Sequence, residues 1–180
     1  MAPAHTSEPP PNSTDPEGEF PLGPPEYFFY LLFQAARQRD LQFDQDLAPT
    51  GLNLAQWRTL AIIRRLEACT MGLLARFSTI DRTTLTRSVD QLVARGLVER
   101  WTPERDRRQV NLALSDLGEE TYSKAVAILR ERNQAVLGDV DPAKLREATR
   151  VLQTALANLV HDQTLSDDLI TFGRTGTAGT

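Results

Sequence analysis

The fold is decided by the stretch at residues 69–114, which reads CTMGLLARFSTIDRTTLTRSVDQLVARGLVERWTPERDRRQVNLAL. Thr70 can cap a short helix that extends to Phe77, because its hydroxyl can accept a hydrogen bond from an unpaired backbone N–H. Ser78-Thr79-Ile80 then forms a tight turn, and Asp81 can cap a second helix in the same way. The stretch therefore begins with two helices joined by three residues.

A β-hairpin follows the second helix. Four apolar residues at helical spacing extend that helix to about residue 95: Leu85, Val89, Leu92 and Val93. Gly96 can end it in the left-handed conformation. Two β-like runs cover 97–102 and 109–114, and the second alternates apolar residues with others, as a half-buried strand does. The loop between these runs, at 103–108, is charged.

This order of short helix, turn, helix and hairpin is that of a winged helix-turn-helix. Such a scaffold lays its second helix in the major groove of DNA, and its hairpin reaches the backbone or the minor groove. Arginine can bind guanine edges and phosphates, and threonine can contact phosphates and thymine. We therefore expect Leu85 to point inward, and we expect five residues of the second helix to contact DNA: Arg82, Thr83, Thr84, Thr86 and Arg87.

The sequence divides into five segments: a disordered Pro-rich arm at 1–25, a helix at 26–53, the winged domain at 54–114, C-terminal helices at 115–165 and a flexible tail at 166–180. The arm holds eight of the eleven prolines and lacks the apolar side chains that would offset the entropy of ordering it. From Tyr27 to Ala36 the first helix is apolar on nearly all sides, which favours burial against a second subunit. The expected fold class is mainly α with a small β-hairpin wing.

Three further helices complete this prediction. Asn53 can cap a helix at about 54–66, and Ser115 can cap a long helix that ends near Leu137. Asp141-Pro142 opens a last helix, because proline is tolerated in the first helical turn.

The composition excludes several classes of protein. The 180 residues include one cysteine and two histidines, which excludes an intrachain disulfide, a Cys-rich zinc site and a His-containing catalytic triad. No stretch approaches the roughly 18 uninterrupted apolar residues of a membrane span, and the N-terminus has no basic and apolar regions of a secretory signal. We therefore expect a cytoplasmic, non-enzymatic protein with no metal, no cofactor and no membrane partner.

The charges are distributed unevenly along the chain. The formal net charge is −4, but residues 54–113 contain 11 basic and 6 acidic residues. Residues 1–53 contain 2 basic and 8 acidic residues, and residues 114–180 contain 7 and 10. The basic segment includes every arginine of the expected DNA-contacting helix and of the charged loop. This distribution favours a nucleic-acid partner, whose phosphates attract a basic surface.

Residues 28–118 resemble the MarR family of winged-helix transcriptional regulators. The resemblance rests on four stretches: LAPTGL at 47–52 leading to Gln56-Trp57; DRTTLTR at 81–87; GLVER at 96–100; and DRR at 106–108 followed by LALS at 112–115 and Gly118. Ser115 stands where the family usually has threonine, and it can still cap a helix.

The resemblance implies a homodimer that binds a pseudo-palindromic operator with half-sites about one helical turn apart. The first helix and the last two would form the dimerisation region. Arg108 would enter the minor groove, and Asp106 would brace the wing arginines by a charge-assisted hydrogen bond. Arg105 and Arg107 would add phosphate contacts. The expected function is that of a transcriptional regulator, and we favour a repressor.

Family members often bind small anionic, frequently aromatic molecules between the dimerisation helices and the winged domain. Six residues could form such a site here: Tyr30, Phe33, Gln34, Arg37, Trp57 and Arg58. Arginine can pair with a carboxylate beside aromatic walls, so the effector would be an aromatic acid or its coenzyme A thioester. The same residues suit a dimer core and surface equally well, and Trp57 is more typical of a helix core than of a ligand wall.

Cys69 offers an alternative, a redox-responsive regulator. It directly precedes the Thr70 cap, and a helix N-terminus can lower the pKa of a thiol. The other interpretation is an inert buried cysteine. A charged run such as that at 105–108 is also often only a solvated loop, and a winged helix can serve as a protein-interaction module without DNA.

Overall fold

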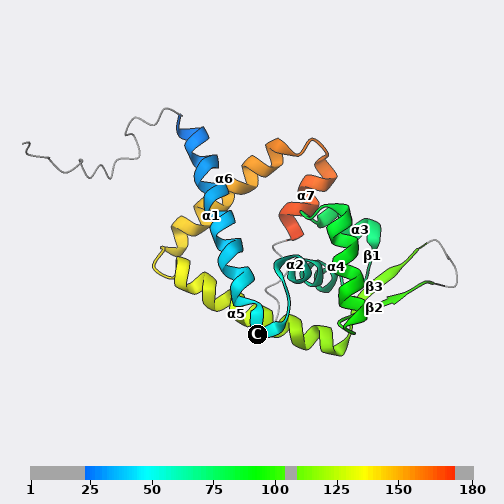
Figure 1. Ribbon diagram of the computed structural model, residues 1–180. Helices are drawn as coiled ribbons and strands as arrows, with labels where there is room; N and C mark the ends of the chain where they lie inside the picture. Colours follow the sequence, from blue (N-terminus) through cyan, green and yellow to red (C-terminus); the bar gives the residue numbers. More distant parts are fainter. Residues whose placement is uncertain (1–22, 104–108, 173–180) are drawn as a thin grey trace, which may run out of the picture. The chain divides into compact units, whose positions relative to one another are not determined.

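The structure is a computed structural model, and it describes residues 23–103 and 109–172 (Figure 1). Its elements, in chain order, are α1 (Pro24–Asp46), the 3-10 turn η1 (Ala48–Thr50), α2 (Leu54–Arg65), β1 (Cys69–Thr70), α3 (Met71–Phe77), α4 (Arg82–Ala94), β2 (Val98–Trp101), β3 (Asn111–Leu114), α5 (Asp116–Leu137), α6 (Pro142–Leu159) and α7 (Gln163–Phe172). The predicted fold class, mainly α with a small β-hairpin wing, is confirmed. The chain divides into two compact units, one ending at Leu41 and the other beginning at Gln42.

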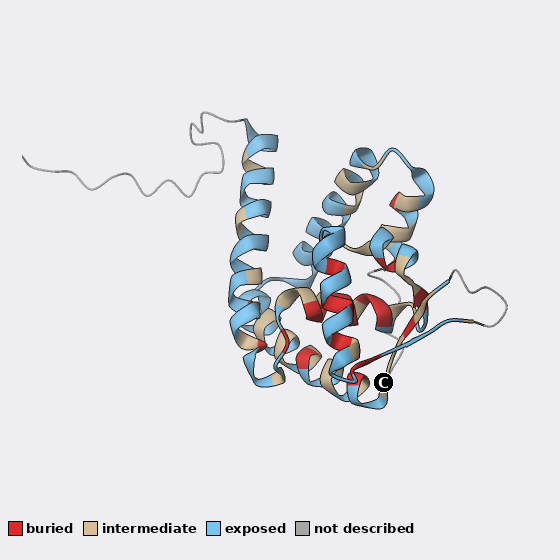
Figure 2. Ribbon diagram, turned by 45° about the vertical axis from the view of Figure 1, so that its right-hand side comes forward, coloured by how far each residue is buried: buried red, intermediate tan, exposed pale blue. Residues whose placement is uncertain are grey.

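The described part of the first unit is the N-terminal portion of α1. Its apolar side chains are exposed in the single chain, and most of the helix is pale blue in Figure 2; they are Phe29, Tyr30, Leu31, Leu32, Phe33 and Leu41. A contiguous set of exposed apolar side chains on one helix is typical of a surface that another molecule covers.

The core of the second unit lies among α2, α3, α4 and the sheet. Its fully buried side chains include Leu60, Ile63, Leu74, Leu85, Val89, Leu92 and Leu112. On α4 the buried residues recur every three or four positions, as predicted, because that spacing keeps them on one face of a helix. The opposite face of α4 is therefore left in solvent.

Four side chains cap helices where the sequence predicts them: Asn53 before α2, Thr70 before α3, Asp81 before α4 and Ser115 before α5. Each accepts a hydrogen bond from the backbone N–H three residues later. Gly96 follows α4 with φ of 69°, a left-handed conformation that costs glycine little. These local interactions set where the helices of the winged domain begin and end.

The sheet has three antiparallel strands in the order β1-β3-β2. In the hairpin, Val98 lies opposite Leu114 and Trp101 lies opposite Asn111. The edge strand β1 places Cys69 opposite Leu112. The sequence does not predict β1, because two residues are too few to show the alternation that identifies a strand.

The C-terminal helices differ in their burial. α6 contains no buried residue, whereas α7 contains the fully buried Ser166. The sequence places the start of a flexible tail at residue 166, but α7 continues to Phe172. The Gly- and Thr-rich residues that indicate a tail come after α7 in the sequence. The predicted boundary at residue 166 therefore lies too early in the chain. No helix in the part of the chain that the structure describes is long and apolar enough to cross a membrane.

Candidate nucleic-acid interface

The exposed face of α4 carries the residues that the sequence predicts to contact DNA. All five are exposed: Arg82, Thr83, Thr84, Thr86 and Arg87. Leu85, Ser88 and Val89 point to the core and hold the helix in place. Arg82 and Arg87 form no ion pair with any residue in 23–103 or 109–172, so both guanidinium groups face solvent from the first two turns.

The first turn of α4 is ordered by Asp81. Its carboxylate accepts a hydrogen bond from the Thr84 backbone N–H at 2.9 Å. Hydrogen bonds from the Thr84 side chain and then from the Thr84 backbone lower the pKa of Asp81 below its ordinary value. The hydroxyl of Thr86 donates to the Arg82 carbonyl at 2.9 Å, so its oxygen can still accept a hydrogen bond. The first turn of α4 is therefore ordered by hydrogen bonds, with its hydroxyl and guanidinium groups exposed.

The wing is attached to α4 by an ion pair. Arg100 of β2 donates to the Asp90 carboxylate of α4 at 2.7 Å. The two charged groups are exposed, so their main effect is on orientation and not on stability. The predicted wing contacts, Arg105, Asp106, Arg107 and Arg108, lie outside the described residues, and their roles stay predictions.

The other end of α4 is held by polar contacts. Arg95, which follows α4, donates to the Gly51 carbonyl at 2.9 Å, and Gln56 donates to Gln91 at 2.9 Å. These contacts connect the end of α4 to Gly51, in the loop between η1 and α2, and to α2 itself. The exposed face of α4 is thus supported at both ends by residues of the same unit.

The residues predicted to bind an effector fall into two groups. Tyr30, Phe33, Gln34 and Arg37 lie on α1 in the first unit, and Trp57 and Arg58 lie on α2 in the second. The Trp57 ring packs edge-on against Phe43, with centroids 5.7 Å apart, and stacks on Tyr122 at 5.4 Å. Trp57 is 8% exposed and is a core residue, which agrees with its interpretation as part of a helix core and not of a ligand wall.

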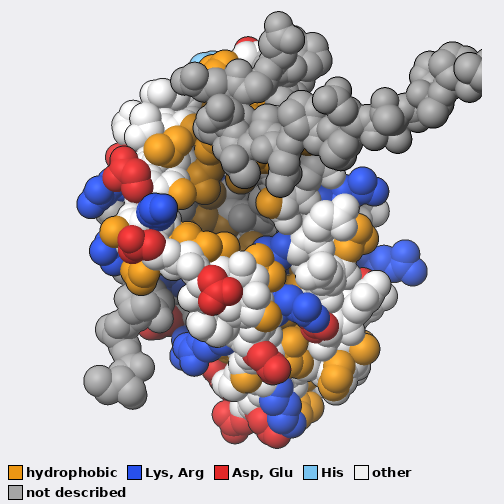
Figure 3. Space-filling model, turned by 90° about the vertical axis from the view of Figure 1, so that its left-hand side faces the viewer, with side chains coloured by type: hydrophobic (Ala, Val, Ile, Leu, Met, Phe, Trp, Pro, Cys, Tyr) orange, Lys and Arg blue, Asp and Glu red, His pale blue; other side chains and the backbone are white. Residues whose placement is uncertain are grey.

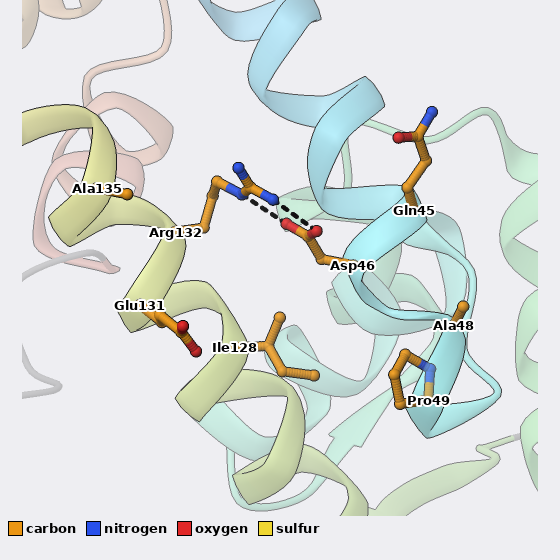
Figure 4. Close-up of a pocket in the computed structure, with 8 residues that line it drawn as sticks. All are labelled: Gln45, Asp46, Ala48, Pro49, Ile128, Glu131, Arg132 and Ala135. Carbon is orange, nitrogen blue, oxygen red and sulfur yellow. Dashed lines mark hydrogen bonds and ion pairs between the residues drawn. The ribbon is translucent and has the colours of Figure 1, made fainter.

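A surface cavity of about 540 Å³ lies elsewhere in the second unit, between the end of α1, η1 and α5 (Figure 4). Its walls are formed by Gln45, Asp46, Ala48, Pro49, Ile128, Glu131, Arg132 and Ala135, none of which is among the residues predicted to bind an effector. Across it the Arg132 guanidinium donates two hydrogen bonds of 2.6 Å to the Asp46 carboxylate. The cavity therefore combines apolar walls with one cation and two carboxylates.

This ion pair changes the acidity of both partners. The hydrogen bonds from Arg132 lower the pKa of Asp46, against the opposing effect of desolvation. The same hydrogen bonds raise the pKa of Arg132. The two residues are 86 positions apart, and no local pattern in the sequence could reveal that they meet. The tie connects the end of α1 to the middle of α5.

The structure distinguishes the two interpretations of Cys69, an activated thiol and an inert buried cysteine. Cys69 is 3% exposed, and burial raises its pKa to about 11. This favours the interpretation of Cys69 as an inert buried cysteine over that of a redox-active thiol, because burial disfavours the thiolate and outweighs the nearby helix N-terminus. In the part of the chain that the structure describes, no group of three or more His, Cys, Asp or Glu side chains could hold a metal ion.

Comparison with known proteins gives one family match and many structural matches. Residues 52–110 match the model of the MarR family. A MarR-family transcriptional regulator from Silicibacter pomeroyi aligns with a TM-score of 0.67 and 26% identity, over 76% of this chain and 92% of that chain. A MarR variant from E. coli in complex with operator DNA aligns with a TM-score of 0.64 and 23% identity, over 71% and 91% of the two chains.

A third structure comes from Bordetella bronchiseptica. It belongs to BpsR, whose DNA binding is regulated by 6-hydroxynicotinic acid, and it aligns with a TM-score of 0.64 and 24% identity, over 72% of this chain and 98% of that chain. At sequence identities of 23% and 24%, the likeness to the E. coli and Bordetella proteins shows a shared fold. All three alignments cover nearly the whole of the other protein, so the likeness extends beyond residues 52–110 to helices outside the winged domain.

Proposed function

Because this chain belongs to the MarR family of winged helix-turn-helix regulators, we propose that it binds a pseudo-palindromic operator as a homodimer and represses transcription until a small aromatic acid releases it. The observation that carries this proposal is the exposed polar and basic face of α4, with Leu85 and Val89 turned inward. A second helix of this kind enters the major groove. Arg82 and Arg87 would bind guanine edges or phosphates, and the threonines would contact phosphates or thymine methyl groups.

The proposed dimer would cover apolar surface that the single chain exposes. On α6, Leu145, Leu152 and Leu159 follow one another at intervals of seven residues and are all exposed. That interval repeats the same face of a helix and is typical of helix pairing. Figure 3 shows hydrophobic side chains exposed between charged ones on the surface. A twofold dimer would present two copies of α4 to two half-sites.

DNA recognition can be tested with Arg87→Ala. The probe is a duplex that the wild-type chain selects from a random-sequence library, at one stated salt concentration. Loss of the guanidinium should weaken binding about tenfold or more, and it should reduce the salt dependence by about one counterion if the contact is to phosphate. Lys144→Ala removes one exposed positive charge from α6 and should leave the affinity unchanged. Equal affinities of Arg87→Ala and the wild type would contradict the assignment of α4.

For the effector we propose the cavity at Asp46 and Arg132. A carboxylate that entered it would compete with Asp46 for Arg132, since arginine binds carboxylates through two parallel hydrogen bonds. The competition would break the tie between α1 and α5. A ligand that favours the broken arrangement would shift the protein away from the arrangement that binds DNA.

The effector proposal makes opposite predictions for two variants. Thermal shift with 6-hydroxynicotinic acid or benzoate reports binding, because a ligand of the folded state raises the melting temperature. Asp46→Asn removes the competing carboxylate and should strengthen binding of the acid, whereas Arg132→Gln should abolish it. Arg37→Gln is the matched control, and loss of binding in this variant alone would instead assign the effector to the cluster at Tyr30, Phe33 and Arg37 on α1.

A further inference from the structure

The C-terminal helix α7 lies against the helix-turn-helix within the second unit (Figure 1). It follows α6 after a short connection at residues 160–162 and packs against it. Side chains of α7 also reach α2 and α3, as the contacts of Phe172 and Asp168 show. α7 therefore touches both α6 and the first helix of the helix-turn-helix.

Phe172, at the end of α7, makes three of these contacts. Its ring stacks on Phe77 of α3, with centroids 4.6 Å apart and an angle of 20° between the planes. The Arg65 Nε of α2 donates to the Phe172 carbonyl at 2.8 Å. The Arg65 guanidinium also lies 5.5 Å from the centre of the Phe172 ring, within the range of a cation–π interaction. One residue thus contacts both α2 and α3.

A second link lies one helical turn earlier. The Asp168 carboxylate pairs with Arg76 of α3 at 2.9 Å. Between α6 and this link, Ser166 is fully buried, and its hydroxyl has no hydrogen-bond partner among the described residues. A buried hydroxyl without a partner is unfavourable, so α7 is held in place by its other contacts.

These contacts matter because α3 is short and only lightly buried. It has seven residues, and Leu74 is its only buried side chain within the described chain. Phe77 is its last residue and precedes the three-residue turn that leads to Asp81 and α4. A shift of Phe77 would therefore move the start of the recognition helix relative to the wing.

We propose that α7 is a strap that fixes α3 and the turn in the arrangement that recognises the operator, with Phe172 as its positioning residue. The proposal rests on the proposed DNA-binding function. It assigns Phe172 no contact with DNA. Because α7 continues from α6, the strap also connects a proposed dimerisation helix to the helix-turn-helix.

The test compares Phe172→Ala with Thr171→Ala in the full chain. Both variants leave the net charge unchanged, and Thr171 is an exposed neighbour whose hydroxyl bonds only to carbonyls of α7. Binding is measured to the selected operator duplex and to a scrambled duplex of equal length. Phe172→Ala should weaken operator binding about fivefold to tenfold, in the range of ordinary coupling between sites. Binding to the scrambled duplex should not change, because it depends on charge.

Amide hydrogen exchange supplies a readout that does not depend on DNA. Phe172→Ala should accelerate exchange in α3 and the following turn, while α5 keeps the wild-type rate. Phe172→Tyr retains the stacked ring and should restore both the operator affinity and the slow exchange.

Three results would overturn the strap. The first is wild-type operator affinity in Phe172→Ala with only a lower melting temperature, which is the behaviour of a residue that only stabilises the fold. The second is equal loss of affinity for both duplexes. The third is unchanged exchange in α3. A wild-type chain that selects no DNA sequence would instead refute the proposed function, and hydrogen exchange would still decide whether α7 holds α3.

Discussion

At the scale of single residues, Gly118 illustrates how closely two segments approach in the winged domain. A Cβ at this position would overlap the Leu97 carbonyl oxygen, which accepts a hydrogen bond from the Ser115 backbone N–H. The Leu97 segment is backbone and cannot turn aside as a flexible side chain would. Glycine is therefore required by the space available.

Gly118→Ala should lower the free energy of unfolding by about 1–3 kcal/mol, the usual range for overpacking a filled site. Gly72→Ala is a matched control in α3, because the nearest atom to its Cβ would be the Thr70 hydroxyl oxygen at 3.8 Å. The control should be neutral or slightly stabilising, since alanine favours the helix. Urea denaturation measures both changes, and equal stabilities of the two variants would show that Leu97 and α5 are not in close contact.

The ion pair of Asp46 and Arg132 predicts a pH dependence. The pKa of Asp46 is lowered from its ordinary value of 3.8, chiefly by hydrogen bonds from Arg132. The folded chain therefore binds this proton more weakly than the unfolded chain. The resulting stabilisation is complete above the ordinary pKa and is lost as the pH falls through the lower, folded-state value.

Asp46→Asn should remove this contribution. The melting temperature of the variant should lie below that of the wild type near neutral pH, and the difference should shrink as the pH is lowered toward about 3. Other carboxylates titrate in both proteins, so the difference between the two curves isolates Asp46. A difference that stays constant with pH would show that the pair does not perturb this carboxyl.

The sequence was most informative where interactions are local. Asn53, Thr70, Asp81 and Ser115 were all predicted as caps because each bonds to a backbone N–H three residues away. Asp46 and Arg132 were not predicted, because only the completed fold brings them together. The sequence left two interpretations of Cys69 open for the same reason, since its burial depends on the strand that pairs with β1.

At the scale of elements, the connection from β3 to α5 depends on Ser115. Its hydroxyl accepts from the Gly118 backbone N–H at 3.1 Å and donates to the Gly96 carbonyl at 2.6 Å. It therefore caps α5 and at the same time ties that helix to the end of α4.

Ser115→Ala should destabilise the fold by about 1–2 kcal/mol, because both hydrogen bonds are lost. Ser115→Thr keeps the hydroxyl and should retain most of the stability. Thr121→Ala, a half-buried position on α5 whose hydroxyl donates to the Leu117 carbonyl, should have little effect. Thermal unfolding compares the three variants, and a neutral Ser115→Ala would show that the cap contributes nothing.

The helices of the winged domain were predictable because each has a cap and a regular apolar face. The short strand β1 has neither, and its existence depends on pairing with β3. α7 was missed because its place depends on contacts of Phe172 with Arg65 and Phe77, more than 80 positions earlier, and no local pattern in the sequence shows such contacts. The wing loop at 104–108 lies outside the described residues, so its predicted contacts await experiment.

At the scale of the whole molecule, the apolar stripe on α6 should determine the state of association. Leu152 is the central residue of this stripe. Leu152→Glu would place a charge in the proposed interface, where burying an unpaired carboxylate is costly. The variant should sediment as a monomer at concentrations at which the wild type is a dimer, and it should bind the operator more weakly.

Thr154→Glu provides the control for this experiment. It adds the same charge to an exposed position on α6 that lies on a different side of the helix from Leu152. It should remain a dimer. If both variants dissociate, added charge weakens association wherever it is placed on α6. If neither variant dissociates, α6 is not part of the dimer interface.

The uneven charge distribution was already visible in the sequence. The excess of basic residues falls within 54–113, the segment that contains the helix-turn-helix and the wing. Charge and family could therefore be inferred without a structure, whereas the cavity proposed above for the effector could not. The residues of the cavity come from α1, η1 and α5, and the distance along the chain between them conceals their proximity.

The burial of Cys69 has a practical consequence. It is the single cysteine in the sequence, it lies on the edge strand of the sheet, and it is almost inaccessible. A thiol reagent can therefore react only when this part of the protein opens, so the rate of labelling divided by that of the unfolded chain gives the opening equilibrium of the β1–β3 pair. Cys69 is therefore a built-in reporter of the opening of the winged domain. The same labelling reaction with DNA bound would show how far DNA lowers the frequency of this opening.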